Sequence, residues 1–180
     1  MQRMRLFDLA FFSVLAWLSE WLASYLTRTM GVGFSVSFTL ALTVIAMIRW
    51  GPIGCIVGVI GGVGAFVSAG GEDYLTLIYY AGANVFLALP TLVYSARDTD
   101  WITERPGRLA LAVLACYLSL CVGKWLALIV LYRDWDGGVD YFFAELIPLV
   151  FNLLLCLLLR SRDGLICNMR LEEDDENGQT

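Results

Sequence analysis

Histidine is absent from this 180-residue chain, and charged residues are scarce, at 16%. A zinc site or a catalytic triad built on imidazole therefore has no basis here, and we expect neither an enzyme nor a cofactor-binding protein. The sequence also lacks the Lys-Ser/Thr ending of a nucleotide-binding loop and any basic stripe. ATP hydrolysis by this chain and nucleic-acid binding are thus not expected.

Apolar residues are abundant instead, at 59%, with a mean hydropathy of +0.71. Soluble domains average about 45–50% apolar and about 25% charged residues. A core formed by a chain of this size cannot enclose such a surplus, so most of it must face lipid. The composition predicts an all-α membrane protein.

Six apolar runs approach the roughly 20 residues that a membrane-spanning helix needs. They are Leu6–Thr27, Phe34–Ile48, Ile53–Ala69, Tyr74–Tyr94, Leu109–Leu131 and Tyr141–Leu159. Arg49, Gly51 and Pro52 separate the second run from the third and predict a tight hairpin. Arg3 and Arg5 before the first run also fit a signal peptide, but Glu20 within it favours a retained helix.

Arginines are distributed unevenly between the connecting segments. If the N-terminus is cytoplasmic, two arginines lie in outer loops, Arg28 and Arg133, and nine lie on the cytoplasmic side: Arg3, Arg5, Arg49, Arg97, Arg105, Arg108, Arg160, Arg162 and Arg170. This asymmetry predicts that both termini are cytoplasmic. We expect a transmembrane domain over residues 1–163 and a disordered acidic tail over 164–180, which holds Glu172, Glu173, Asp174, Asp175 and Glu176.

Three ionisable residues interrupt the apolar runs, and ionisable residues inside a membrane are functional candidates. Glu20, Lys124 and Glu145 all fall in the outer half of the predicted membrane, and Asn84 and Asn152 lie near the middle of their helices. Together they predict a polar vestibule that opens outward.

Helical spacing brings aromatic residues onto the same faces as these polar groups. We expect a ligand-binding site composed of Lys124, Glu145, Asn84, Asn152, Trp17, Glu20, Trp21, Tyr80 and Tyr117. Lys124 indicates an anionic ligand and the tryptophans a flat ring. The alternative is structural: Lys124 pairs with Glu145 or Glu20, and the tryptophans anchor the chain at the membrane interface.

Small residues have a packing interpretation. Gly54, Gly58 and Gly62 recur every four residues in the third run, a spacing that lets helix backbones approach closely in lipid. The cysteines, namely Cys55, Cys116, Cys121, Cys156 and Cys167, have no metal or redox spacing and are interpreted as packing residues.

The second-run ending Arg49-Trp50-Gly51-Pro52, the glycine-spaced third run, and Ile147-Pro148 followed by Asn152 resemble the substrate-binding S components of energy-coupling factor (ECF) vitamin transporters. The resemblance covers Leu6 to Leu159. It implies six helices in a bacterial plasma membrane and high-affinity binding of a vitamin-like nutrient from outside. It also implies a pocket that includes the 28–33 loop.

The same resemblance implies three partner subunits, a transmembrane coupling subunit and two ATP-binding cassette subunits. In that family the first helix often contacts the coupling subunit through Ala-xxx-Ala. The nearest match here is Ser19-xxx-Ala23, with Ser13 and Ala16 in the same small-residue series, so these four residues are the expected docking positions.

Two other functions remain open. A structural subunit of a membrane complex, such as the small polytopic proteins of the cell-shape machinery, would explain the glycine packing but not the polar cluster. A proton-coupled carrier usually has ionisable residues on both sides of the membrane midplane, and the predicted inner half has none.

Overall fold

The computed structural model describes residues 2–30, 36–93 and 102–160. Within these ranges the chain is helical and has no strand, which confirms the all-α prediction. The elements are α1 (Gln2–Met30), α2 (Thr39–Trp50), η1 (Gly51–Gly54), α3 (Cys55–Ser68), α4 (Tyr74–Tyr80), η2 (Gly82–Ala88), α5 (Leu89–Val93), α7 (Pro106–Tyr132), α8 (Gly137–Ala144) and α9 (Leu146–Arg160). The predicted start at Phe34, the predicted end at Tyr94, the 163/164 boundary, Cys167 and the acidic tail lie outside the described residues.

Several helical stretches of the described chain are long and apolar enough to cross a membrane. Four qualify singly, namely Arg3–Thr29, Thr39–Ser68, Tyr74–Leu92 and Pro106–Tyr132, and the bent pair α8–α9 makes a fifth if it is one span. These helices are compatible with a membrane protein. The count differs from the six predicted runs because Thr39–Ser68 is one helical stretch that contains two of them.

That stretch turns back on itself, as the Arg49–Pro52 sequence predicts. Gly51, at the end of α2, has a φ of 70°, a conformation that favours glycine. Along the two arms, Gly54 lies against the Ala46 backbone and Gly61 against the Thr39 side chain. The predicted hairpin is therefore formed, and its glycines allow the close approach of its arms.

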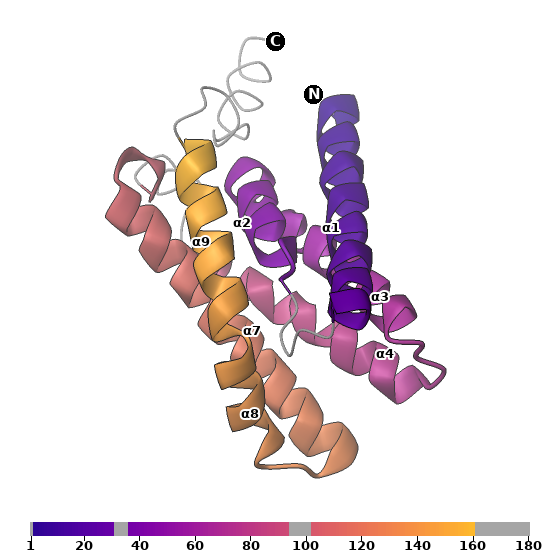
Figure 1. The fold of residues 1–180 in the computed structure, drawn as a ribbon. Helices are drawn as coiled ribbons and strands as arrows, with labels where there is room; N and C mark the ends of the chain where they lie inside the picture. Colours follow the sequence, from indigo (N-terminus) through magenta and orange to yellow (C-terminus); the bar gives the residue numbers. More distant parts are fainter. Residues whose placement is uncertain (1, 31–35, 94–101, 161–180) are drawn as a thin grey trace.

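Helix α2 is the centre of the fold, since all twelve of its residues are buried. One apolar cluster joins it to α1 and includes Phe12 and Ile45. A second joins it to α7 and α9, and includes Val44, Val113 and Cys156. In Figure 1, α2 accordingly lies between α1 and α9, enclosed by other helices of the chain.

Two predicted helices are broken. The Tyr74–Tyr94 run divides into α4, the 3-10 helix η2 and α5. The final run begins earlier than expected, at Gly137, and bends by 42° between α8 and α9. Pro148 explains this bend, because it has no N–H to donate to the Ala144 carbonyl one turn earlier.

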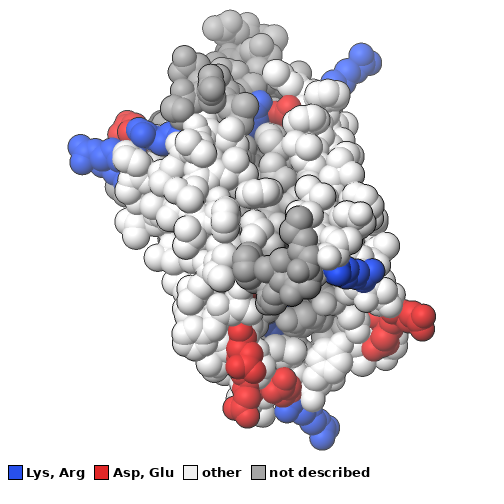
Figure 2. All heavy atoms as spheres, viewed as in Figure 1, with Lys and Arg blue, Asp and Glu red and all other residues white. Residues whose placement is uncertain are grey.

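The two ends of the bundle differ in charge. The start of α1 and the end of α9 lie at the same end of the molecule, and the α3–α4 and α7–α8 connections lie toward the other (Figure 1). Figure 2 shows acidic side chains gathered at the second end and basic ones prominent at the first. At the first end Arg49 pairs with Asp8 at 2.7 Å, and the Trp50 indole donates to the same carboxylate.

Candidate functional site

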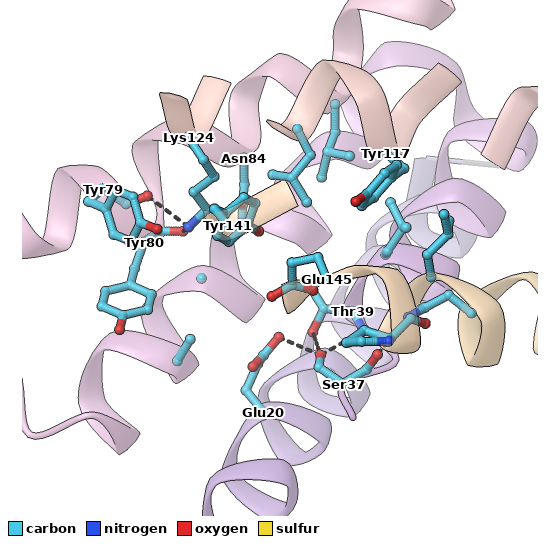
Figure 3. A pocket seen from close by; sticks show the side chains of 18 of the residues that line it. Glu20, Ser37, Thr39, Tyr79, Tyr80, Asn84, Tyr117, Lys124, Tyr141 and Glu145 are labelled. Carbon is cyan, nitrogen blue, oxygen red and sulfur yellow. Dashed lines mark hydrogen bonds between the residues drawn. The ribbon is translucent and has the colours of Figure 1, made fainter. Parts of the chain in front are cut away.

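A cavity of about 340 Å³ opens between α1, α2, α3, α4, η2, α7, α8 and α9. Seven of the predicted site residues line it: Glu20, Tyr80, Asn84, Tyr117, Lys124, Glu145 and Asn152. Figure 3 labels all of them except Asn152 and shows the labelled side chains arranged around one space. The structure thus brings together residues from four stretches of the chain that lie far apart in the sequence.

Lys124 projects from α7 toward the end of α4. Its ammonium donates hydrogen bonds to the carbonyl oxygens of Tyr79 at 2.8 Å and Tyr80 at 3.3 Å. It also lies over the rings of Tyr79, Tyr80 and Tyr141, 4.4 to 5.8 Å from their centroids. These carbonyls are exposed to the lysine because the backbone changes from α to 3-10 geometry just after Tyr80.

The ion pair between Lys124 and Glu145 or Glu20, which the structural alternative predicts, is not formed. Within the described ranges, the ion pairs at 4.0 Å or less are Arg49–Asp8 and Arg108–Glu104, and Lys124 takes part in neither. The carbonyl ends of α4 and the three tyrosine rings hold the ammonium instead. Carbonyls at the C-terminal end of a helix carry partial negative charge, which suits a cation.

Glu20 lies on α1 and faces the start of α2. Its carboxylate accepts a 2.5 Å hydrogen bond from the Ser37 hydroxyl. Ser37 in turn accepts the backbone N–H of Thr39 at 3.1 Å, and so ties the first turn of α2 to α1. One carboxylate of the cavity is thus positioned by the N-terminus of the central helix.

Glu145 occupies the break between α8 and α9. Its backbone N–H still bonds to the Tyr141 carbonyl, and its own carbonyl accepts from Leu149. Its carboxylate lines the cavity, and no other described residue forms a hydrogen bond or ion pair with it. In Figure 3 this side chain points into the space that Glu20 also faces.

The two asparagines fasten helices to one another. Asn152 accepts the Ala41 N–H at 2.7 Å, and its amide nitrogen donates to the Ser37 and Pro148 carbonyls. It therefore satisfies an unpaired donor in the first turn of α2. Asn84 donates to the Gly58 carbonyl of α3 at 2.6 Å.

Tyrosines form much of the remaining wall. Tyr117 is buried, and its hydroxyl donates to the Phe142 carbonyl at 2.6 Å. Tyr79, Tyr80 and Tyr141 gather around Lys124 (Figure 3). The wall therefore combines flat apolar faces with the carboxylates and the ammonium, as small-molecule sites commonly do.

The two tryptophans of the predicted site do not line the cavity. Trp17 packs on Gly64 of α3, and Trp21 is 54% exposed and stacks on Tyr25. Glu20 and Trp21 are consecutive residues and so point about 100° apart around α1. Of Trp17, Glu20 and Trp21 on α1, Glu20 alone lines the cavity.

The small residues expected to dock a partner are mostly enclosed by this chain. Ser13, Ala16 and Ala23 are buried, and the Ser19 hydroxyl accepts the Phe38 N–H. The exposed face of α1 carries large apolar residues instead, including Phe7, Phe11, Val14, Leu18 and Leu22. In this structure the four small residues serve packing within the chain.

Sequence reasoning missed several lining residues, namely Ser37, Thr39, Tyr79 and Tyr141. Tyr141 precedes Glu145 by one helical turn, and that spacing could have identified it. Ser37 and Thr39 lie at the start of the second apolar run, where hydroxyls commonly cap a helix. Of the predicted 28–33 loop, residues 31–33 lie outside the described part, and Arg28 donates to the Ser68 carbonyl.

A metal centre has no support in the described ranges, where no three Cys, Asp or Glu side chains come together as ligands. Buried Cys116, Cys121 and Cys156 belong to the apolar core. Comparison with known protein families, curated proteins and solved structures gives no match to this chain.

Proposed function

We propose that this protein is a membrane-embedded binding subunit that captures a small vitamin-like nutrient for uptake. The observation that carries the proposal is the 340 Å³ cavity lined by Lys124, Glu20, Glu145 and four tyrosines. Ionisable groups inside a membrane protein lower its free energy of unfolding. A cavity lined with charged and aromatic residues is therefore best explained by a ligand that binds there. A purely structural subunit has no need of it.

The proposal includes a topology of six spans with both termini cytoplasmic, in a bacterial plasma membrane. The arginine distribution supports it, and so do the acidic residues of the α3–α4 and α7–α8 connections at the opposite end. The cavity residues Glu20, Lys124 and Glu145 would then be reached from outside.

We further propose that transport depends on other subunits, as the resemblance to ECF S components implies. The chain has no nucleotide-binding motif, so a coupling subunit and two ATP-binding cassette subunits would supply the driving force. The purified chain in liposomes should therefore bind its nutrient without accumulating it.

The test is to identify small molecules that co-purify with the protein, using a variant whose cavity is filled. Ala65 of α3 lines the cavity, whereas Val67 on the same helix is 54% exposed on the outer surface. Mass spectrometry should find a small molecule enriched on the wild type and on Val67→Phe, but absent from Ala65→Phe. The same small-molecule profile in all three proteins would favour a structural subunit.

A further inference from the structure

The charged groups of the cavity are not equally engaged by the protein. An ammonium has three N–H donors. Lys124 directs two of them to the Tyr79 and Tyr80 carbonyls, and it also lies over three tyrosine rings. These neutral groups stabilise the ammonium, and they leave it at most one further donor for a ligand.

The carboxylates are less well compensated. Glu20 accepts a hydrogen bond from the neutral Ser37 hydroxyl, and the Glu145 carboxylate has no such partner within the described ranges. Figure 3 shows both carboxylates directed toward the same part of the cavity, with Lys124 turned toward the tyrosines. Two like charges at one low-dielectric site repel each other, and a cation between them would remove that repulsion.

The lining also suits the rest of such a ligand. The tyrosine rings that surround the cavity offer flat apolar faces, and a cation near them gains further attraction from the ring electrons. A cavity of about 340 Å³ admits a molecule of one or two rings.

We infer that the ligand carries a basic nitrogen, bound as a cation between Glu20 and Glu145, with a flat ring against the tyrosines. This inference rests on the proposed binding function and changes the expected charge of the ligand. Lys124 taken alone indicates an anion, but the cavity lining has two carboxylates for this one ammonium, and the ammonium is directed to neutral carbonyls and rings.

Three matched probes test the inference: phenethylamine, its neutral derivative N-acetylphenethylamine, and the acid 3-phenylpropionate. Each is titrated against the full chain in detergent, with melting temperature and tryptophan fluorescence as readouts. We expect phenethylamine to bind at least about tenfold more tightly than either analogue, as for a hydrogen-bonded charge pair.

Two variants locate the contact. Glu145→Gln should weaken phenethylamine binding about tenfold or more, and Glu20→Gln, which keeps an acceptor for Ser37, serves as a second variant. Asp140→Asn removes one negative charge from an exposed position on the same outer end and should leave affinity unchanged.

Tighter binding of 3-phenylpropionate, or an amine affinity that is the same in Glu145→Gln, Glu20→Gln and wild type, would overturn the inference. So would the absence of binding by all three probes. The co-purification experiment separates this failure from failure of the proposed function: an acid recovered from the wild type but not from Ala65→Phe would leave a binding subunit with the opposite charge preference.

Discussion

Asn84 and Asn152 are alike in the sequence, as amides within apolar helices, yet the protein uses them to different extents. Asn152 makes three hydrogen bonds, to Ala41, Ser37 and Pro148, so its amide serves the fold. In the described part of the chain, the Asn84 side chain makes one, from its amide nitrogen to the Gly58 carbonyl. The sequence predicts a role for both amides, and both join helices, but it does not indicate that Asn152 makes more of these contacts.

Replacing Asn152 should therefore destabilise the protein. Asn152→Leu removes the partner of the Ala41 N–H and of the Ser37 carbonyl, and each buried group left unpaired costs about 1–3 kcal/mol. We expect the free energy of unfolding to fall by at least about 2 kcal/mol, measured by denaturation in detergent. The control is Leu154→Ala on the outer face of α9; an equal loss in both variants would contradict the assignment.

Lys124 gives a second test at this scale. Lys124→Met removes the donor to the Tyr79 and Tyr80 carbonyls. The free energy of unfolding should therefore fall by about 1–3 kcal/mol, which a lower melting temperature would report. Because Lys124 forms no ion pair with Glu145, adding Glu145→Gln should not restore the loss. Rescue in the double mutant would instead indicate a buried salt bridge, in which the second change removes an orphaned charge.

Among the helices, the closest approach at the cavity is between α3 and the α4–η2 break. A Cβ on Gly62 would meet the Tyr80 carbonyl and the Ala81 backbone, as well as the Asn84 amide. The glycine-spaced run is thus confirmed as packing chemistry. The close contact at Gly62 also positions the Tyr80 carbonyl, which accepts a hydrogen bond from Lys124.

Gly62→Ala should displace the backbone between α4 and η2, which a Cβ at this position would meet. Overpacking of this kind typically costs about 1–3 kcal/mol, so we expect a lower melting temperature and weaker phenethylamine binding. The matched control is Gly107→Ala in the first turn of α7, where an added Cβ meets nothing within 4 Å. That change should leave stability unchanged or raise it by up to about 1 kcal/mol, through the better helix propensity of alanine.

The helices and the hairpin could be predicted from the sequence, whereas the break within the Tyr74–Tyr94 run could not. Hydropathy located the apolar runs, and the Arg49–Pro52 sequence located the hairpin, because turn residues interrupt an apolar stretch. The break after Tyr80 carries a weaker signal, the single residue Gly82, and α3 packs closely against this break at Gly62. For the same reason the sequence placed Lys124 at the cavity but could not identify carbonyls as its partners.

The distribution of arginines over the whole molecule predicts that both termini are cytoplasmic, and this orientation can be tested. In a Cys167→Ser background, a cysteine at Asp136 should react with a membrane-impermeant maleimide in intact cells. A cysteine at Arg105 should react only after permeabilisation. Both positions are exposed, so accessibility within the protein does not limit either reaction. The reverse pattern would mean that the termini are outside.

The burial of α2 on every side has a consequence for how the chain is made. Its hairpin arms have 12 and 14 residues, whereas spanning the hydrocarbon takes about 20. When this hairpin leaves the ribosome, α7 and α9, which will enclose it, have not yet been synthesised. In the proposed topology the hairpin would therefore reach its final depth only after the C-terminal helices have closed around it.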